Sequence, residues 1–75
     1  MRNKVFEIVA EIMDMATADI NESSSPQTVN KWDSLRHMKL ILALEESLGI
    51  QFTDGDLNRM KDVSTILQII SARKP

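Results

Sequence analysis

Residues 33–49, "DSLRHMKLILALEESLG", decide the fold of this chain. Asp and Ser are common at the N-cap of a helix, and Gly is the usual residue just beyond a helix C-terminus. Between these signals the apolar residues recur at spacings of three and four. The stretch therefore predicts a helix from about Ser34 to Leu48, with Gly49 as its stop.

The apolar surface of this helix is broader than a single stripe. One side is the expected core face, with Leu40, Ile41, Leu44 and Leu48. A second cluster, rotated away from the first, contains Leu35, Met38 and Leu42. It is either buried in a central helix or exposed as a docking patch. We favour the docking patch for Leu35 and Met38, which lie beside charged residues in the first turn, and both interpretations remain open for Leu42.

The rest of the chain predicts three more helices. One covers roughly residues 3–16, where the apolar positions at helical spacing are Val5, Ile8, Val9, Ile12 and Ala16. A short helix lies within 53–60, with Thr53 and Asp54 as caps, and Asp62 can cap the last helix. The last stripe is Val63, Ile66, Leu67 and Ile70. The expected fold is all-α, a four-helix bundle in one domain over residues 1–75.

A long loop, "TADINESSSPQTVNKWD" (17–33), separates the first two long helices. Loops of this length in small domains are more often functional than not. The apolar residues Ile20, Val29 and Trp32 are expected to pin the loop onto the bundle. Trp32 is therefore interpreted as an anchor and not as a ligand-stacking residue.

Composition excludes several kinds of protein. A net charge of −2 leaves no basic stripe for nucleic acid, and the absence of Cys excludes disulfides and Cys-type zinc sites. No apolar run is long enough to span a bilayer, so we expect no membrane insertion. The absence of Cys suits a cytoplasmic location, and we expect a monomer. Asp54, Asp56 and Asp62 are interpreted as caps and solvated charges, with no metal site. His37, the single His, is expected to be an exposed surface residue, so no Ser-His catalytic arrangement is predicted.

Ser34 allows two interpretations. It can be part of a helix cap, with Asp33 or Ser34 accepting a bond from a following N–H group. It can also be a point of attachment, because the free N–H groups at a helix N-terminus would stabilise a phosphodiester on its hydroxyl. Electrostatics alone does not separate these two roles.

The residues that follow Ser34 separate them. Asp33-Ser34-Leu35 is followed in order by "LALEE" (42–46), "GIQF" (49–52), an acidic short helix at 54–60 and Asp62-Val63. Over essentially the whole chain this order resembles the acyl carrier protein family. The resemblance implies a four-helix bundle with a long first loop and a short third helix, and a carrier that is not an enzyme.

The resemblance also implies the cofactor. Ser34 would carry 4′-phosphopantetheine, transferred from coenzyme A by a Mg-dependent phosphopantetheinyl transferase, with Asp33 helping to present the site and Leu35 beside it. Acyl-loading and acyl-transfer enzymes would be further partners. The reactive thiol would belong to the prosthetic group, which suits a chain without Cys.

The resemblance places the docking residues mainly on the second helix. Leu35 and Met38 match partner contacts, Leu42 matches the mouth of an acyl pocket, and Glu45 and Glu46 match acidic residues of the same face. Arg36 and Lys39, however, stand where typical fatty-acid carriers have acidic residues. Charges at the rim of an interface steer association and reject wrong partners. We therefore expect this chain to recognise partners by a different pattern of surface charge from that of typical fatty-acid carriers.

These charges favour a specialised stand-alone carrier, in a fatty-acid-like, polysaccharide or secondary-metabolite pathway. Two alternatives remain. An aminoacyl or peptidyl carrier is one, although "KWDS" lacks the Gly residues that often precede the Ser in such carriers. The other is a small helical interaction module that is never modified.

Overall fold

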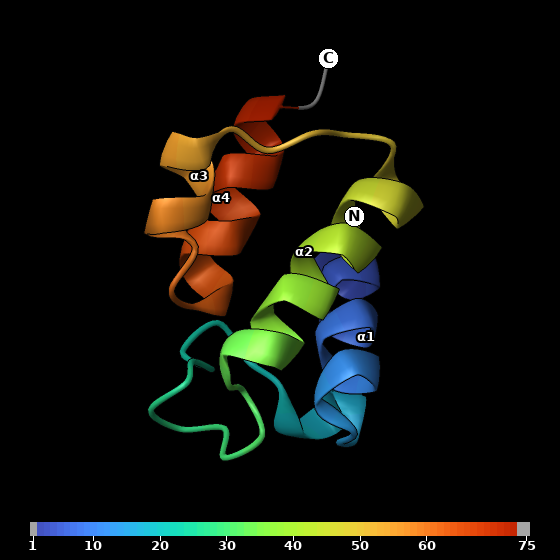
Figure 1. The fold of residues 1–75 in the computed structure, drawn as a ribbon. Coiled ribbons are helices and arrows are strands. Elements are labelled where there is room, and N and C mark those ends of the chain that lie inside the picture. Colours follow the sequence, from blue (N-terminus) through green and yellow to red (C-terminus); the bar gives the residue numbers. More distant parts are fainter. Residues whose placement is uncertain (1, 74–75) are drawn as a thin grey trace.

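The computed structural model describes residues 2–73 and contains four α-helices (Figure 1). The elements are α1 (Arg2–Met13), the 3₁₀ turn η1 (Thr17–Asp19), α2 (Ser34–Leu48), α3 (Asp54–Arg59) and α4 (Val63–Arg73). Helices α1 and α2 pack side by side, and the short α3 lies against α4. Three longer helices, a short third helix and no strand in residues 2–73 confirm the predicted all-α bundle.

One apolar core holds the bundle together. α2 contributes Leu40, Ile41 and Leu44, and every helix except α3 contributes at least three buried apolar side chains. Three loop residues are also at most 5% exposed, as the loop pattern predicted: Ile20, Val29 and Trp32. Burial of these three side chains in the core holds the long loop against the helices.

Helix α1 ends three residues earlier than predicted. Asp14 has a left-handed φ of 56°, and its N–H donates to the Glu11 carbonyl at 3.2 Å. The N–H of Met15 donates to the Ala10 carbonyl at 3.0 Å, which completes a Schellman-type ending on a residue other than Gly. Ala16 consequently lies outside the helix and is exposed, so its assignment to the apolar face is wrong.

Helices α2 and α3 have the expected end signals with one correction. Gly49 has a φ of 66°, and its N–H donates to the Glu45 carbonyl at 2.9 Å. Thr53 is the N-cap of α3: its hydroxyl accepts from the Asp56 N–H at 3.1 Å, while Asp56 accepts from the Thr53 N–H at 3.0 Å. This is a capping box, and Asp54, which was predicted as a cap, is instead the first residue of the helix.

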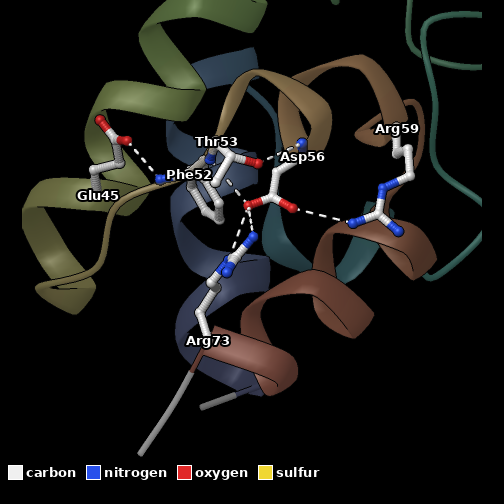
Figure 2. Close-up of polar contacts among 6 residues, drawn as sticks. All are labelled: Glu45, Phe52, Thr53, Asp56, Arg59 and Arg73. Carbon is white, nitrogen blue, oxygen red and sulfur yellow. Dashed lines mark hydrogen bonds and ion pairs between the residues drawn. The ribbon is translucent and has the colours of Figure 1, made fainter.

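Asp56 is a buried charge, contrary to the expectation of a solvated one. It is 1% exposed, and its Oδ2 accepts from Arg73 Nε at 2.9 Å and from Arg73 Nη2 at 2.6 Å (Figure 2). Arg59 Nη2 donates to Oδ1 at 3.0 Å. The Thr53 N–H bond, followed by the two guanidinium groups, outweighs burial and lowers the pKa of Asp56 from 3.8 to about 2. This one carboxylate therefore ties α3 to the last turn of α4.

The Asp56 cluster predicts a defined loss of stability in acid. Because the pKa is lower in the folded chain, the unfolded chain binds more protons between about pH 4 and pH 2, and the free energy of unfolding falls as the pH falls through that range. Asp56→Asn should be less stable than wild type at neutral pH and should lack this part of the acid-dependent loss. Denaturant titrations at a series of pH values measure both effects.

Asp54→Asn is the matched control, because Asp54 lies two residues away on the same helix and is exposed. The part of the acid-dependent loss that Asp56→Asn removes should remain in Asp54→Asn, because the bonds of Asp56 stay intact. Parallel curves for wild type and Asp56→Asn below about pH 4 would contradict the assignment.

Candidate functional site

Asp33 ends the long loop and caps α2. Its Oδ1 accepts from the Arg36 N–H at 2.9 Å, and its carbonyl accepts the first helical bond from the His37 N–H at 2.8 Å. Asp33 is therefore the N-cap, and Ser34 is the first residue of the helix. The capping role that the sequence left open between these two residues belongs to Asp33.

This leaves the Ser34 hydroxyl unused by the fold. Ser34 is exposed, and no hydrogen bond within residues 2–73 involves its Oγ. It lies in the first turn of α2, where backbone N–H groups without helical partners and the helix dipole favour a negative charge. The arrangement suits a hydroxyl that accepts an anionic substituent.

An open groove of about 680 Å³ borders Ser34. It is lined by residues of the long loop, of the first two turns of α2, of α3 and of the connection between α3 and α4. Its lining includes Trp32, Ser34, His37, Met38, Leu57 and Met60. Because most of the lining surface is apolar, the groove suits a narrow, partly apolar chain that starts at the Ser34 hydroxyl.

The second apolar cluster of α2 faces solvent. Leu35 is 65% exposed, Met38 is 51% and Leu42 is 60%. The spacings of three and four residues place them in one stripe along the helix. The open question about Leu42 is thereby answered, since it is exposed and not part of the core.

The charged residues predicted for docking fall into two groups. Lys39 and Glu46 are exposed, whereas Arg36 and Glu45 are partly buried and bonded. Arg36 Nη1 donates to the Ile12 carbonyl at 2.5 Å, in the last turn of α1, and Glu45 Oε2 accepts from the Phe52 N–H at 2.9 Å (Figure 2). The sequence pattern did not reveal these structural roles, because both bonds join separate segments of the chain.

His37 is not the exposed surface residue that was predicted. It is half-buried, and its Nδ1 accepts a hydrogen bond from Trp32 Nε1 at 3.0 Å. The two ring planes are 24° from parallel, and their centroids lie 6.2 Å apart. Burial lowers the pKa of His37 below its usual value. Trp32 is thus a loop anchor, as predicted, and also a hydrogen-bond donor to the helix.

Two kinds of feature are absent from the part of the chain that the structure describes. Within residues 2–73, no group of three or more His, Cys, Asp or Glu side chains is placed to hold a metal ion. None of the helices α1 to α4 is long and apolar enough to cross a membrane.

The capping geometry predicts effects of different size for substitutions at two neighbouring residues. Asp33→Ala removes the cap and should lower the free energy of unfolding by about 1 kcal/mol, whereas Asp33→Asn keeps a capping oxygen and should cost less. Ser34→Ala should change it by less than about 0.5 kcal/mol, because its hydroxyl makes no bond in the fold. Denaturant titration measures all three variants, and a larger loss for Ser34→Ala than for Asp33→Ala would contradict the assignment.

The comparisons with known proteins agree with this geometry. No family model matches the chain. Acyl carrier proteins from Rickettsia canadensis (strain McKiel), Rickettsia rickettsii (strain Iowa) and Rickettsia typhi (strain ATCC VR-144 / Wilmington) are each 32% identical to it over 74 residues, which cover 99% of this chain and 86% of each relative. A solution structure of the holo acyl carrier protein from Geobacter metallireducens matches with a TM-score of 0.85 and 26% identity, over 96% of this chain and 83% of that one.

Similarity at this level over nearly the full length, together with the matching bundle, shows the family. Its members are carriers and not enzymes, and they generally carry 4′-phosphopantetheine. The chain belongs to the acyl carrier protein family.

Proposed function

We propose that the chain carries an acyl group as a thioester on 4′-phosphopantetheine attached to Ser34, and delivers it to partner enzymes. The observation that carries the proposal is the exposed Ser34 hydroxyl, which the Asp33 cap leaves unbonded at the start of α2. The bound group supplies the thiol and the thioester chemistry, and the protein supplies tethering and recognition. The absence of Cys in the chain agrees with this division of roles.

The residues around Ser34 fit such a group. First-turn N–H groups of α2 would stabilise a phosphodiester on the hydroxyl, and the cap keeps the Asp33 carboxylate bonded to the Arg36 N–H. The groove beside Ser34 offers the partly exposed Leu57 as apolar surface for the arm. None of these residues is needed as an acid or base. They keep the Ser34 hydroxyl exposed and accommodate the group attached to it.

Modification is tested by intact mass spectrometry. The protein is incubated with coenzyme A, Mg²⁺ and a broad-specificity phosphopantetheinyl transferase. Wild type should gain the mass of one phosphopantetheinyl group, and Ser34→Ala should gain none.

Ser47→Ala is the matched control, because Ser47 is also exposed on α2 but lies near its C-terminus. It should be modified like wild type. Wild type that stays unmodified with several transferases would contradict the proposal and favour the alternative, an unmodified interaction module.

We further propose that partners dock on the exposed stripe of Leu35, Met38 and Leu42, beside the cation of Lys39. The stripe lies on the same helix as Ser34, so a docked enzyme would meet both. The exposed apolar side chains would form the contact itself, and the charge at its edge would select partners of opposite charge. The positive charge of Lys39 favours partners with acidic rims. This supports a specialised carrier of a fatty-acid-like, polysaccharide or secondary-metabolite pathway, whose cytoplasmic location is part of the same proposal.

The docking stripe makes a kinetic prediction. Met38→Glu should lower kcat/KM of the transferase that modifies wild type by about 10- to 100-fold, which is the range expected for a central contact of about 1–3 kcal/mol. With a partner whose rim is acidic, Lys39→Glu should lower the association rate at low salt. Added salt should then raise this rate, whereas it should lower the rate of wild type. Arg36 is unsuitable for this test, because its bond to the Ile12 carbonyl would be lost as well.

Gln68→Glu provides the control, since it adds the same charge to the exposed face of α4. It should leave the kinetics unchanged. Equal loss of rate in Gln68→Glu and Met38→Glu would show that charge alone matters and would remove the stripe from the docking surface.

A further inference from the structure

His37 lines the groove beside Ser34, and the buried Trp32 determines which of its ring nitrogens carries the proton. Indole Nε1–H is only a donor, so the bond from Trp32 to His37 Nδ1 requires that Nδ1 carry no proton. The neutral imidazole then carries its proton on Nε2. Trp32 is 3% exposed and packed in the core, so the donor that fixes this tautomer is itself held in place.

His37 lies near the proposed attachment point. His37 follows Ser34 by three residues in α2, which places both on one face of the helix, and both line the same groove. Within residues 2–73, Nε2 makes no hydrogen bond. A histidine whose tautomer is fixed therefore lines the groove one turn from Ser34.

The charges around the groove leave this donor neutral. The charged residues that line it are Asp33, on the loop, and Lys61, on the connection between α3 and α4. The Asp33 carboxylate already accepts from the Arg36 N–H. Burial lowers the pKa of His37, in the same direction as the requirement that Nδ1 accept from the indole. Both observations favour an imidazole that is neutral, with one tautomer, near neutral pH.

We propose that His37 Nε2–H donates a hydrogen bond to an amide carbonyl oxygen of the 4′-phosphopantetheine arm and so positions the arm along the groove. This rests on the proposed attachment at Ser34. A fixed donor selects an acceptor, and the amide carbonyls of the arm are acceptors tethered close to it, which raises their effective concentration. Met38 and Leu57 provide apolar surface for the methyl and methylene groups of the same arm. His37 is thus a positioning residue, and Trp32 sets its tautomer.

Nitrogen NMR of His37 tests the proposal directly, because the chain has a single His. In ¹⁵N-His-labelled apo protein, Nε2 should be protonated and Nδ1 unprotonated. After conversion to the holo form, verified by intact mass, exchange of the Nε2–H proton with water should slow by about two- to tenfold, as expected for one net hydrogen bond. An unchanged Nε2–H signal in a fully converted sample, or a proton on Nδ1 in the apo protein, would overturn the role of His37.

Two substitutions separate positioning from structure. His37→Asn places an amide near the position of Nδ1, so it can still accept from Trp32 but has no donor at Nε2. His37→Gln places a donor near Nε2. With isotope-labelled arm, the amide resonances of holo His37→Asn should shift towards those of free pantetheine, and His37→Gln should restore them in part. Arm resonances that are the same in wild type and His37→Asn would overturn the proposal.

Trp32→Phe tests the origin of the tautomer. It keeps an aromatic ring but removes the indole N–H, so protonated Nδ1 should appear in the apo protein beside protonated Nε2. A single Nε2–H tautomer in this variant would show that Trp32 does not determine the tautomer of His37. Failure of wild type to gain mass would reject the attachment at Ser34 and this inference together, whereas full conversion without a change at His37 rejects the inference alone.

Discussion

The bond from the Arg36 N–H to the Asp33 carboxylate sets where α2 begins, and the site depends on that position. Because Asp33 satisfies an N–H group that the helix itself leaves unpaired, Ser34 becomes the first helical residue and its hydroxyl remains free. If Ser34 were the cap, the same oxygen would be bonded to the backbone and turned into the helix. In sequence the pair Asp33-Ser34 looks like an ordinary cap. In the structure Asp33 alone is the cap, and the Ser34 hydroxyl is exposed.

Polar side chains of α2 join it to three other segments. Arg36 binds the Ile12 carbonyl at the end of α1, His37 accepts from Trp32 of the long loop, and Glu45 accepts from the Phe52 N–H before α3. The core face of the helix is buried at Leu40, Ile41 and Leu44, so the helix is fixed on one side. The apolar stripe of Leu35, Met38 and Leu42 remains exposed on another side of the helix. A rigid helix with an apolar exposed face can present a nearby hydroxyl to partners without large rearrangement.

Periodicity predicted the helices, because the buried faces of amphipathic helices follow directly from residue spacing. The family order of motifs then indicated Ser34. What the sequence did not reveal are contacts between distant segments. The end of α1 depends on Asp14 adopting a left-handed conformation that usually belongs to Gly. The buried Asp56 carboxylate is bonded by the Thr53 N–H and by Arg59 and Arg73, and Arg73 lies 17 residues away in the sequence. The burial of His37 likewise depends on where the loop places Trp32. Charged residues give no periodic signal for such pairings.

The most direct test of the central claim maps the modification to a peptide. Trypsin cleaves after Lys31 and after Arg36, and the peptide 32–36, "WDSLR", contains one hydroxyl side chain, that of Ser34. After treatment with coenzyme A and a phosphopantetheinyl transferase, tandem mass spectrometry should find the phosphopantetheinyl group on this peptide alone. Unmodified peptide 32–36 together with the added mass on any other peptide would contradict the account.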